Sequence, residues 1–186
     1  MKANGQNAVV SLADWPPNAG LVERVWALET RQSVVELFNH YARCVDLKDA
    51  AGVAGVFTDD GELCGPRGTL VSERDCIQAV YRRLLGELRT SSHLIGGVQV
   101  QIVSEDRAVA HAAFQAWDSY LPDDEGKCKS DCFSFGQYEA IAVLEADGEW
   151  RFARFGVWFN GQLEVSVVPT GRGSEQLDLP WPPFSH

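Results

Sequence analysis

The chain lacks the features that direct a protein to nucleic acid or to a membrane. It has 26 acidic against 16 basic residues, a formal net charge of −10, and no basic run or stripe. Because Lys and Arg make the contacts to phosphates, this composition argues against nucleic acid and against an anionic membrane surface as partners. No segment approaches the roughly 18 consecutive apolar residues of a membrane-spanning helix, and the first residues lack the apolar run of a signal peptide.

Cysteine is scarce and scattered, which argues against a disulfide framework. The five cysteines are an odd number, and no spacing pattern relates them (Cys44, Cys64, Cys76, Cys128 and Cys132). Free thiols in a cytoplasmic protein are the prediction. Cys128 and Cys132 could form half of a metal site, but a second pair of ligands is missing, so no metal is expected.

What the sequence does contain is enough apolar material for one full domain. Of its 186 residues, 45% are hydrophobic, and they include nine Phe and six Trp. This length is typical of a single domain. Prolines and glycine interrupt any helix near the start, and three prolines mark the end. The prediction is an arm over 1–20, a folded domain over 21–165 and a tail over 166–186.

The first half of the domain has helical periodicity. From Leu21 to about Val45, apolar residues recur at intervals of three and four, which predicts an amphipathic helix. A second helix is predicted from Ala50 to Phe57, ended by Asp59, Asp60 and Gly61. A short strand and turn over 62–70 lead to a third helix, which begins at a capping box of Ser72 and Asp75 and reaches about Leu88.

From His93 onward the apolar period changes from 3.6 to 2, which indicates strands. A first strand includes the alternating residues 98–102, and longer strands are predicted over 108–120, 133–145 and 150–165. Asp147 and Gly148 supply the positive φ angles of a tight hairpin. Helices followed by a run of strands predict an α+β fold, with the helices on one face of a curved antiparallel or mixed sheet.

Three polar residues stand at fixed distances in this apolar pattern. Tyr41 and Asp46 lie five residues apart at the end of the first predicted helix, and His93 follows 47 residues after Asp46. If the carboxylate accepts the N–H of one ring nitrogen, the other nitrogen is free to take a proton. Tyr41, Asp46 and His93 are therefore the predicted catalytic residues.

Each of the three also has a structural interpretation. Tyr41 lies on the apolar stripe of its helix and could be an ordinary core residue. Asp46 could cap the next helix, although a carboxylate at a helix C-terminus is electrostatically unfavourable. His93 could be a structural histidine that Ser91 or Ser92 satisfies.

Several segments resemble the SnoaL-like group of the nuclear transport factor 2-like superfamily, which includes scytalone dehydratase, bile-acid 7α-dehydratase and polyketide cyclase relatives. The matching segments are YARCVDLKDAAGVAGVFTDDGEL, SSHLIGGVQVQIVSEDRAVAHAAF and DGEWRFARF. The resemblance covers about residues 28–165. It implies a cone-shaped barrel, closed at one end, with a deep apolar pocket between sheet and helices, in a homodimer or homotrimer.

The resemblance also implies an activity. The dehydratases and a dehydrochlorinase of this superfamily share an Asp–His pair, which Asp46 and His93 match in context, and the bile-acid enzyme places a Tyr where Tyr41 stands. The ketosteroid isomerase branch has its catalytic Asp where this chain has Gly65, so that mechanism does not carry over in its usual form. Scytalone dehydratase uses its C-terminal segment as a lid, which is one interpretation of the tail.

Together these observations predict a cofactor-free dehydratase, isomerase or cyclase that acts on an apolar carbonyl compound such as a polyketide, terpenoid or steroid-like molecule. A non-catalytic ligand-binding protein and a structural small subunit of the same fold are the alternatives. The side chains predicted to contact the substrate are mostly aromatic, with one acid on the long strand after His93 (Phe38, Tyr81, Phe114, Asp118, Phe155 and Trp158).

Overall fold

The computed structural model describes residues 20–122 and 130–165. The predicted tail with its possible lid lies outside the described residues, as do Cys128 and all of the predicted arm except Gly20. The described chain forms three helices and six strands in the order α1 (Leu21–Asp46), α2 (Ala50–Gly55), β1 (Phe57–Gly65), β2 (Gly68–Ser72), α3 (Arg74–Gly86), β3 (Leu88–Ser104), β4 (Arg107–Tyr120), β5 (Asp131–Leu144) and β6 (Trp150–Val165).

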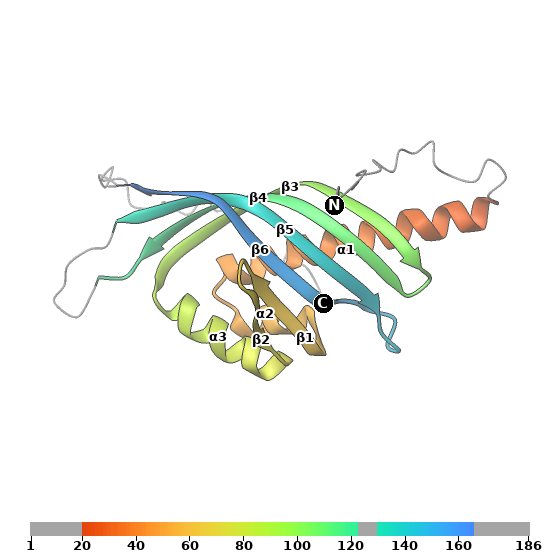
Figure 1. Ribbon diagram of the computed structural model, residues 1–186, viewed down its shortest axis with the longest axis horizontal. Coiled ribbons are helices and arrows are strands. Elements are labelled where there is room, and N and C mark those ends of the chain that lie inside the picture. The colour runs from red at the N-terminus through yellow and green to blue at the C-terminus, as the bar shows by residue number, and fades with distance from the viewer. Residues whose placement is uncertain (1–19, 123–129, 166–186) are drawn as a thin grey trace, which may run out of the picture.

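The six strands form one mixed sheet in the order β2-β1-β6-β5-β4-β3. Neighbouring strands are antiparallel except β1 and β6, which run parallel. The long strands curve over the helices, as Figure 1 shows, and the sheet does not close into a barrel. The predicted α+β fold with a curved sheet is confirmed, whereas the closed barrel is wrong because β2 and β3 stay as open edges in the described chain.

The second helix is shorter than predicted. α2 ends at Gly55, and Phe57 already begins β1, where it pairs with Phe152 of β6. The N–H of Phe152 also donates to the carbonyl of Val56 at 2.8 Å. The sequence at 59–61, predicted to stop a helix, therefore lies within a strand. The partner that stabilises this strand comes from the far end of the domain, where no local pattern could reveal it.

The predicted capping box of the third helix does not form. Ser72 ends β2, and the N-cap of α3 is Glu73, which has a φ of 72° and makes no side-chain cap. The next residue stabilises this junction instead, since Arg74 donates from Nε and Nη2 to the carbonyl oxygen of Phe57 at 2.9 and 2.6 Å.

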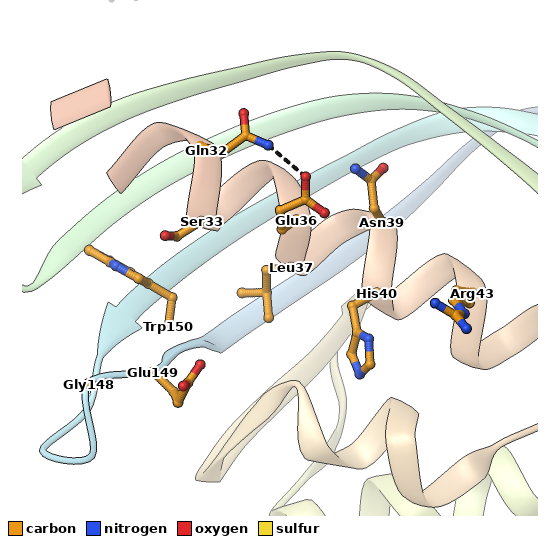
Figure 2. Close-up of a pocket in the computed structure, with 10 residues that line it drawn as sticks. All are labelled: Gln32, Ser33, Glu36, Leu37, Asn39, His40, Arg43, Gly148, Glu149 and Trp150. Carbon is orange, nitrogen blue, oxygen red and sulfur yellow. Dashed lines mark hydrogen bonds between the residues drawn. The ribbon is translucent and has the colours of Figure 1, made fainter. Parts of the chain in front are cut away.

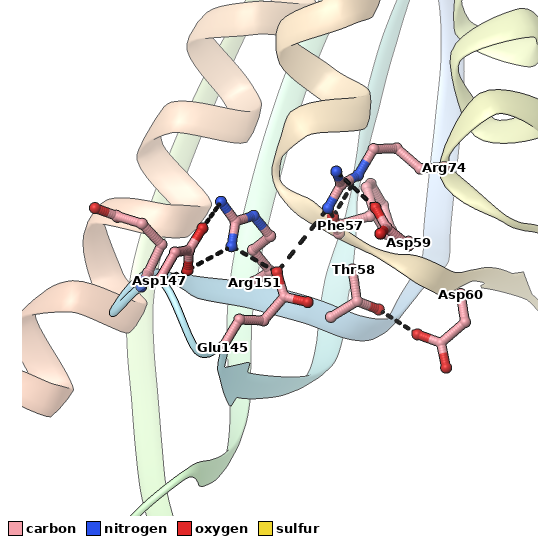
Figure 3. A network of polar contacts seen from close by, with 9 residues as sticks. Phe57, Thr58, Asp59, Asp60, Arg74, Glu145, Asp147 and Arg151 are labelled. Carbon is pink, nitrogen blue, oxygen red and sulfur yellow. Dashed lines mark hydrogen bonds and ion pairs between the residues drawn. The ribbon is translucent and has the colours of Figure 1, made fainter.

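A network of charged side chains joins the β5–β6 hairpin to β1 and α3 (Figure 3). Arg74 pairs with Asp59 at 2.7 Å and lies 4.0 Å from Glu145. Arg151 bonds both Glu145 and Asp147, and its hydrogen bond is the main cause that lowers the pKa of the Asp147 carboxyl to about 2. Because Arg74 of α3 contacts both β1 and the β5–β6 turn, the network connects parts of the chain that are far apart in sequence.

Aromatic rings fill the space between α1 and the sheet. Phe38 of α1 has no exposed surface, and its ring centroid lies 5.1 Å from that of Phe152 and 5.9 Å from that of Phe155. Phe155 also packs 4.9 Å from Tyr138 of β5. Aromatic pairs at such separations add to the stabilisation that burial provides. This cluster is the centre of the core.

We expect Gly136→Ala to destabilise the fold, because β5 and β6 approach too closely there for a side chain. A Cβ at Gly136 would lie 2.0 Å from the Trp158 carbonyl oxygen and 2.9 Å from the Phe114 ring. The loss should be roughly 1–3 kcal/mol of unfolding free energy, as overpacking usually costs. Urea denaturation measures it. Gly96→Ala is the matched control, since nothing lies within 4 Å of its Cβ position; equal losses in both variants would contradict the prediction.

Candidate active site

Asp46 is the last residue of α1, and a backbone motif ends the helix directly after it. The N–H of Lys48 donates to the carbonyl of Val45 at 2.9 Å, and the N–H of Asp49 donates to that of Cys44 at 2.8 Å. This is the pattern of a Schellman ending, which needs a left-handed residue. Lys48 supplies it with a φ of 58°. The position of Asp46 is thus determined by how the helix ends.

The end of α1 is also attached to the start of β3. The Nζ of Lys48 donates to the carbonyl of Leu88 at 2.7 Å. Five residues further along β3, His93 pairs with Ala116 of β4, which is buried on the inner face of the sheet. Because residues directly opposite each other on antiparallel strands point to the same face, His93 lies on this inner face, toward α1.

Asp46 and His93 are in direct contact. The Nδ1 of His93 lies 2.7 Å from the Oδ1 of Asp46, and the backbone N–H of His93 donates to Oδ2 at 3.0 Å. The His93 side chain is 9% exposed and that of Asp46 29%. Both carboxylate oxygens are therefore used by one residue, and Nε2 is the ring nitrogen that no described group bonds.

A second acid reaches His93 through a serine. Ser91 is buried, and its Oγ lies 3.3 Å from the Nδ1 of His93. The same hydroxyl donates to the Oδ1 of Asp118 at 2.7 Å. The sequence predicts that Asp118 contacts the substrate. In the structure Asp118 lies on β4, beside β3, and accepts a hydrogen bond from Ser91.

Tyr41 belongs to a different polar pair. Its hydroxyl lies 2.8 Å from that of Tyr81 on α3, and both side chains are buried. Burial, followed by the neighbouring Tyr81 and Tyr138, raises the pKa of Tyr41 well above its usual value. Burial likewise raises the pKa of Tyr81 to about 12. Both phenols therefore keep their protons at neutral pH, and Tyr41 bonds Tyr81 rather than Asp46 or His93.

Tyr138 is the residue of this region that sequence reasoning missed. It lies on β5 with 1% of its surface exposed, and its ring contacts that of Tyr41 edge-on at 5.7 Å. Burial is the main cause that raises its pKa, followed by the charges of Tyr81 and Asp118. The alternation of buried residues in FSFGQYEA would have placed Tyr138 on the inner face.

The other predicted substrate contacts divide between the two faces of the sheet. Phe38 and Phe155 are fully buried in the core, and Phe114 stacks on Tyr138 with centroids 4.3 Å apart. These rings face inward as predicted, but they pack against one another.

Trp158 is the exception, because it lies on the opposite face of the sheet from these rings. It pairs with exposed Gln137 of β5, whereas Val157 pairs with buried Tyr138. Because neighbouring strand residues point to opposite faces, Trp158 lies on the outer face. Its indole lies over Gly156, where a Cβ would come within 3.0 Å of Nε1.

Two hollows in the described part of the chain lie away from the Asp–His pair. One, of about 610 Å³, is lined by α1 residues such as His40 and by Trp150 beyond the β5–β6 turn (Figure 2). The other, of about 300 Å³, includes Leu94 and Gln137. Neither is lined by Asp46 or His93, so neither is the deep apolar pocket expected around them.

The described residues contain no group of three or more His, Cys, Asp and Glu side chains arranged to hold a metal ion. Nor does this part of the chain include a helix both long and apolar enough to cross a membrane.

The chain matches a known family of domains. The family model of the SnoaL-like domain matches residues 26–156, which is more than half of the chain. The protein therefore belongs to the SnoaL-like family, within the nuclear transport factor 2-like superfamily. A comparison with curated proteins finds no match.

Solved structures share the fold at low sequence identity. A scytalone dehydratase-like protein from Novosphingobium aromaticivorans superposes with a TM-score of 0.68 at 22% identity, over 81% of this chain and 99% of that one. A type 2 hexachlorocyclohexane dehydrochlorinase (LinA) gives 0.68 at 17% identity, over 80% and 99%. A ketosteroid isomerase-like protein from Erwinia carotovora atroseptica gives 0.59 at 21%, over 72% and 98%.

We expect Asp46→Ala to destabilise the protein, because it leaves two N–H groups of His93 without their acceptor. Hydrogen bonds to a charged group contribute roughly 1.5–3 kcal/mol each, so a loss of a few kcal/mol should appear in urea denaturation. The backbone amide of His93 should also exchange faster with deuterium. Glu105→Ala, at an exposed turn, is the control. An unchanged unfolding free energy in Asp46→Ala would contradict the described contact.

We also expect the fold to lose stability at alkaline pH. The unfolded tyrosines ionise near pH 10, whereas the pKa of Tyr81 is raised to about 12 in the folded protein. The contribution of Tyr81 is therefore complete below about pH 10 and is lost as the pH rises toward 12, at about 1.4 kcal/mol per unit of pKa difference. Urea midpoints measured at increasing pH should fall, and less steeply in Tyr81→Phe. Identical pH dependence in both proteins would contradict this assignment.

Proposed function

We propose that the protein is a cofactor-independent acid–base enzyme, a dehydratase, isomerase or cyclase, that removes a proton next to a carbonyl group. The observation that carries the proposal is the 2.7 Å contact between the Nδ1 of His93 and the Oδ1 of Asp46. A carboxylate that accepts the Nδ1–H of a histidine leaves Nε2 as the base.

In this mechanism Nε2 of His93 takes the proton from carbon. Asp46 holds the imidazole ring in place and stabilises the imidazolium that forms, since its negative charge is in direct contact with Nδ1. The protonated ring then returns the proton either to a departing hydroxyl, which gives loss of water, or to another carbon, which gives isomerisation or ring closure.

Tyr41 and Tyr81 are the proposed donors to the developing oxyanion. A phenol can donate a hydrogen bond only while it is protonated, and burial raises the pKa of both residues. The Tyr41 hydroxyl bonds that of Tyr81 and also interacts with that of Tyr138, so each phenol hydrogen already has a partner in this state. In the proposed mechanism the substrate oxygen takes the place of one of these partners and accepts a phenol hydrogen.

The proposed substrate is an apolar, carbonyl-containing small molecule of the polyketide, terpenoid or steroid kind. The support is the aromatic character of the inner face, to which Phe114, Tyr138 and Phe155 belong. The names of the structural relatives, a dehydratase, a dehydrochlorinase and an isomerase, also fit reactions that can begin with proton removal from carbon. A homodimer or homotrimer is the proposed assembly.

Proton abstraction can be tested before the substrate is known. The protein is incubated in deuterated water with a panel of bicyclic and steroidal ketones, and deuterium uptake next to the carbonyl is followed by mass spectrometry. His93→Ala and Asp46→Asn should each slow the uptake by roughly 10² to 10⁴, the usual contribution of a positioned acid–base group.

His111→Ala is the matched control, because this histidine lies on β4 with a side chain that is 57% exposed. It should leave the exchange rate unchanged. If His93→Ala exchanged as fast as the wild type, the proposed base would be wrong. Tight binding of a ketone with no exchange in any variant would instead indicate a ligand-binding protein.

A further inference from the structure

The inner face of the sheet has a second acid–base contact to His93 that the mechanism above does not use. Ser91 and Asp118 are directly opposite each other on β3 and β4, and the neighbouring inner pair along these strands is His93 with Ala116. Ser91, His93 and Asp118 therefore point the same way. The acid comes from a different strand than the histidine that it influences.

The hydrogens of this group can be counted. A serine hydroxyl has a single hydrogen, and Ser91 donates it to the Oδ1 of Asp118 at 2.7 Å. Towards the Nδ1 of His93, 3.3 Å away, Ser91 can then act only as an acceptor. The hydrogen in that contact must belong to Nδ1, which also donates it to Asp46 over the shorter distance of 2.7 Å.

From this count we infer that Ser91 and Asp118 are positioning residues that keep the proton of neutral His93 on Nδ1. While the Asp118 carboxylate holds the serine hydrogen, Ser91 presents only lone pairs to the ring. The competing tautomer, with its proton on Nε2, would place the Nδ1 lone pair against both Asp46 and Ser91. The inference rests on the proposed function only for its catalytic consequence, which is that Nε2 stays available as the base.

This assignment changes the role first predicted for Asp118. One of its oxygens accepts from Ser91, so it acts on the reaction through His93 and need not touch the substrate. The two roles differ in a measurable way. An effect transmitted through Ser91 disappears when the serine hydroxyl is absent, whereas a direct substrate contact does not depend on Ser91.

The tautomer itself is the first readout, and it requires no substrate. In protein labelled with ¹⁵N at histidine, the ring nitrogen shifts report which nitrogen has the proton when the ring is neutral. Ser91→Ala should raise the fraction with the proton on Nε2, relative to the other form, by roughly fivefold, the ratio that one modest hydrogen bond produces. Asp118→Asn should raise it by less, because the Asn amide oxygen still accepts the serine hydrogen, only more weakly than a carboxylate. Ser91→Thr keeps the hydroxyl and should restore the wild-type ratio.

The chain offers a matched control for both variants. Ser104 donates to the Oδ1 of Asp106 at 2.6 Å, in an exposed turn. Ser104→Ala and Asp106→Asn remove the same chemistry from a place where no histidine is bonded. Neither should change the His93 tautomer. Near-ultraviolet circular dichroism of every variant checks that the aromatic core remains folded.

Ketone exchange in deuterated water gives the second readout. Ser91→Ala, Asp118→Asn and the double variant should lower kcat with little change in KM. The double variant should lose no more than Ser91→Ala alone, because Asp118 acts only through the Ser91 hydroxyl. If the losses in the single variants multiplied in the double variant, or if Asp118→Asn mainly raised KM, Asp118 would be a substrate contact and the inference would be overturned.

The two readouts separate the inference from the proposed function. An unchanged tautomer ratio in both Ser91→Ala and Asp118→Asn overturns the inference, whatever the activity. A changed ratio supports it even if wild-type protein exchanges no ketone of the panel, in which case it is the proposed function that lacks support.

Discussion

The Asp46 carboxylate holds the end of the first helix against the third strand, and the geometry of the candidate site depends on this contact. One oxygen accepts the ring N–H of His93 and the other accepts its backbone N–H. Two hydrogen bonds to one residue determine both the position of the strand and the plane of the ring. A carboxylate is electrostatically unfavourable at a helix C-terminus, and the two N–H donors offset that cost.

Around this contact the inner face combines two environments. The aromatic core beside Phe38 and Phe155 is buried and contains the Tyr41–Tyr81 pair, whose protons are retained because burial disfavours the phenolate. His93 is flanked instead by two carboxylates, one bound directly and one through Ser91. Proton abstraction next to a carbonyl requires two components. One is a neutral hydrogen-bond donor in an apolar setting, such as a buried phenol, and the other is a base whose charged form is stabilised by a carboxylate.

Much of the fold could be predicted because its elements are long and periodic. The α1 helix and the strands β4 and β6 lie close to where the apolar patterns placed them. The errors fall at short elements whose stability comes from distant partners. Phe57 joined a strand rather than a helix because it pairs with Phe152, 95 positions later. The start of α3 was wrong for a similar reason, since Arg74 bonds the Phe57 carbonyl and no capping box forms.

The sequence by itself determined which side chains could do acid–base chemistry, since Asp46 ends a periodic helix and His93 lies in an alternating strand. It also determined that Tyr41 faces inward, because the helical stripe does. Only the tertiary structure decided that Ser91 joins Asp118 to His93, that Trp158 faces outward and that the sheet stays open. Strand register and helix docking set these contacts, and both result from the packing of the whole chain rather than from any local run of residues.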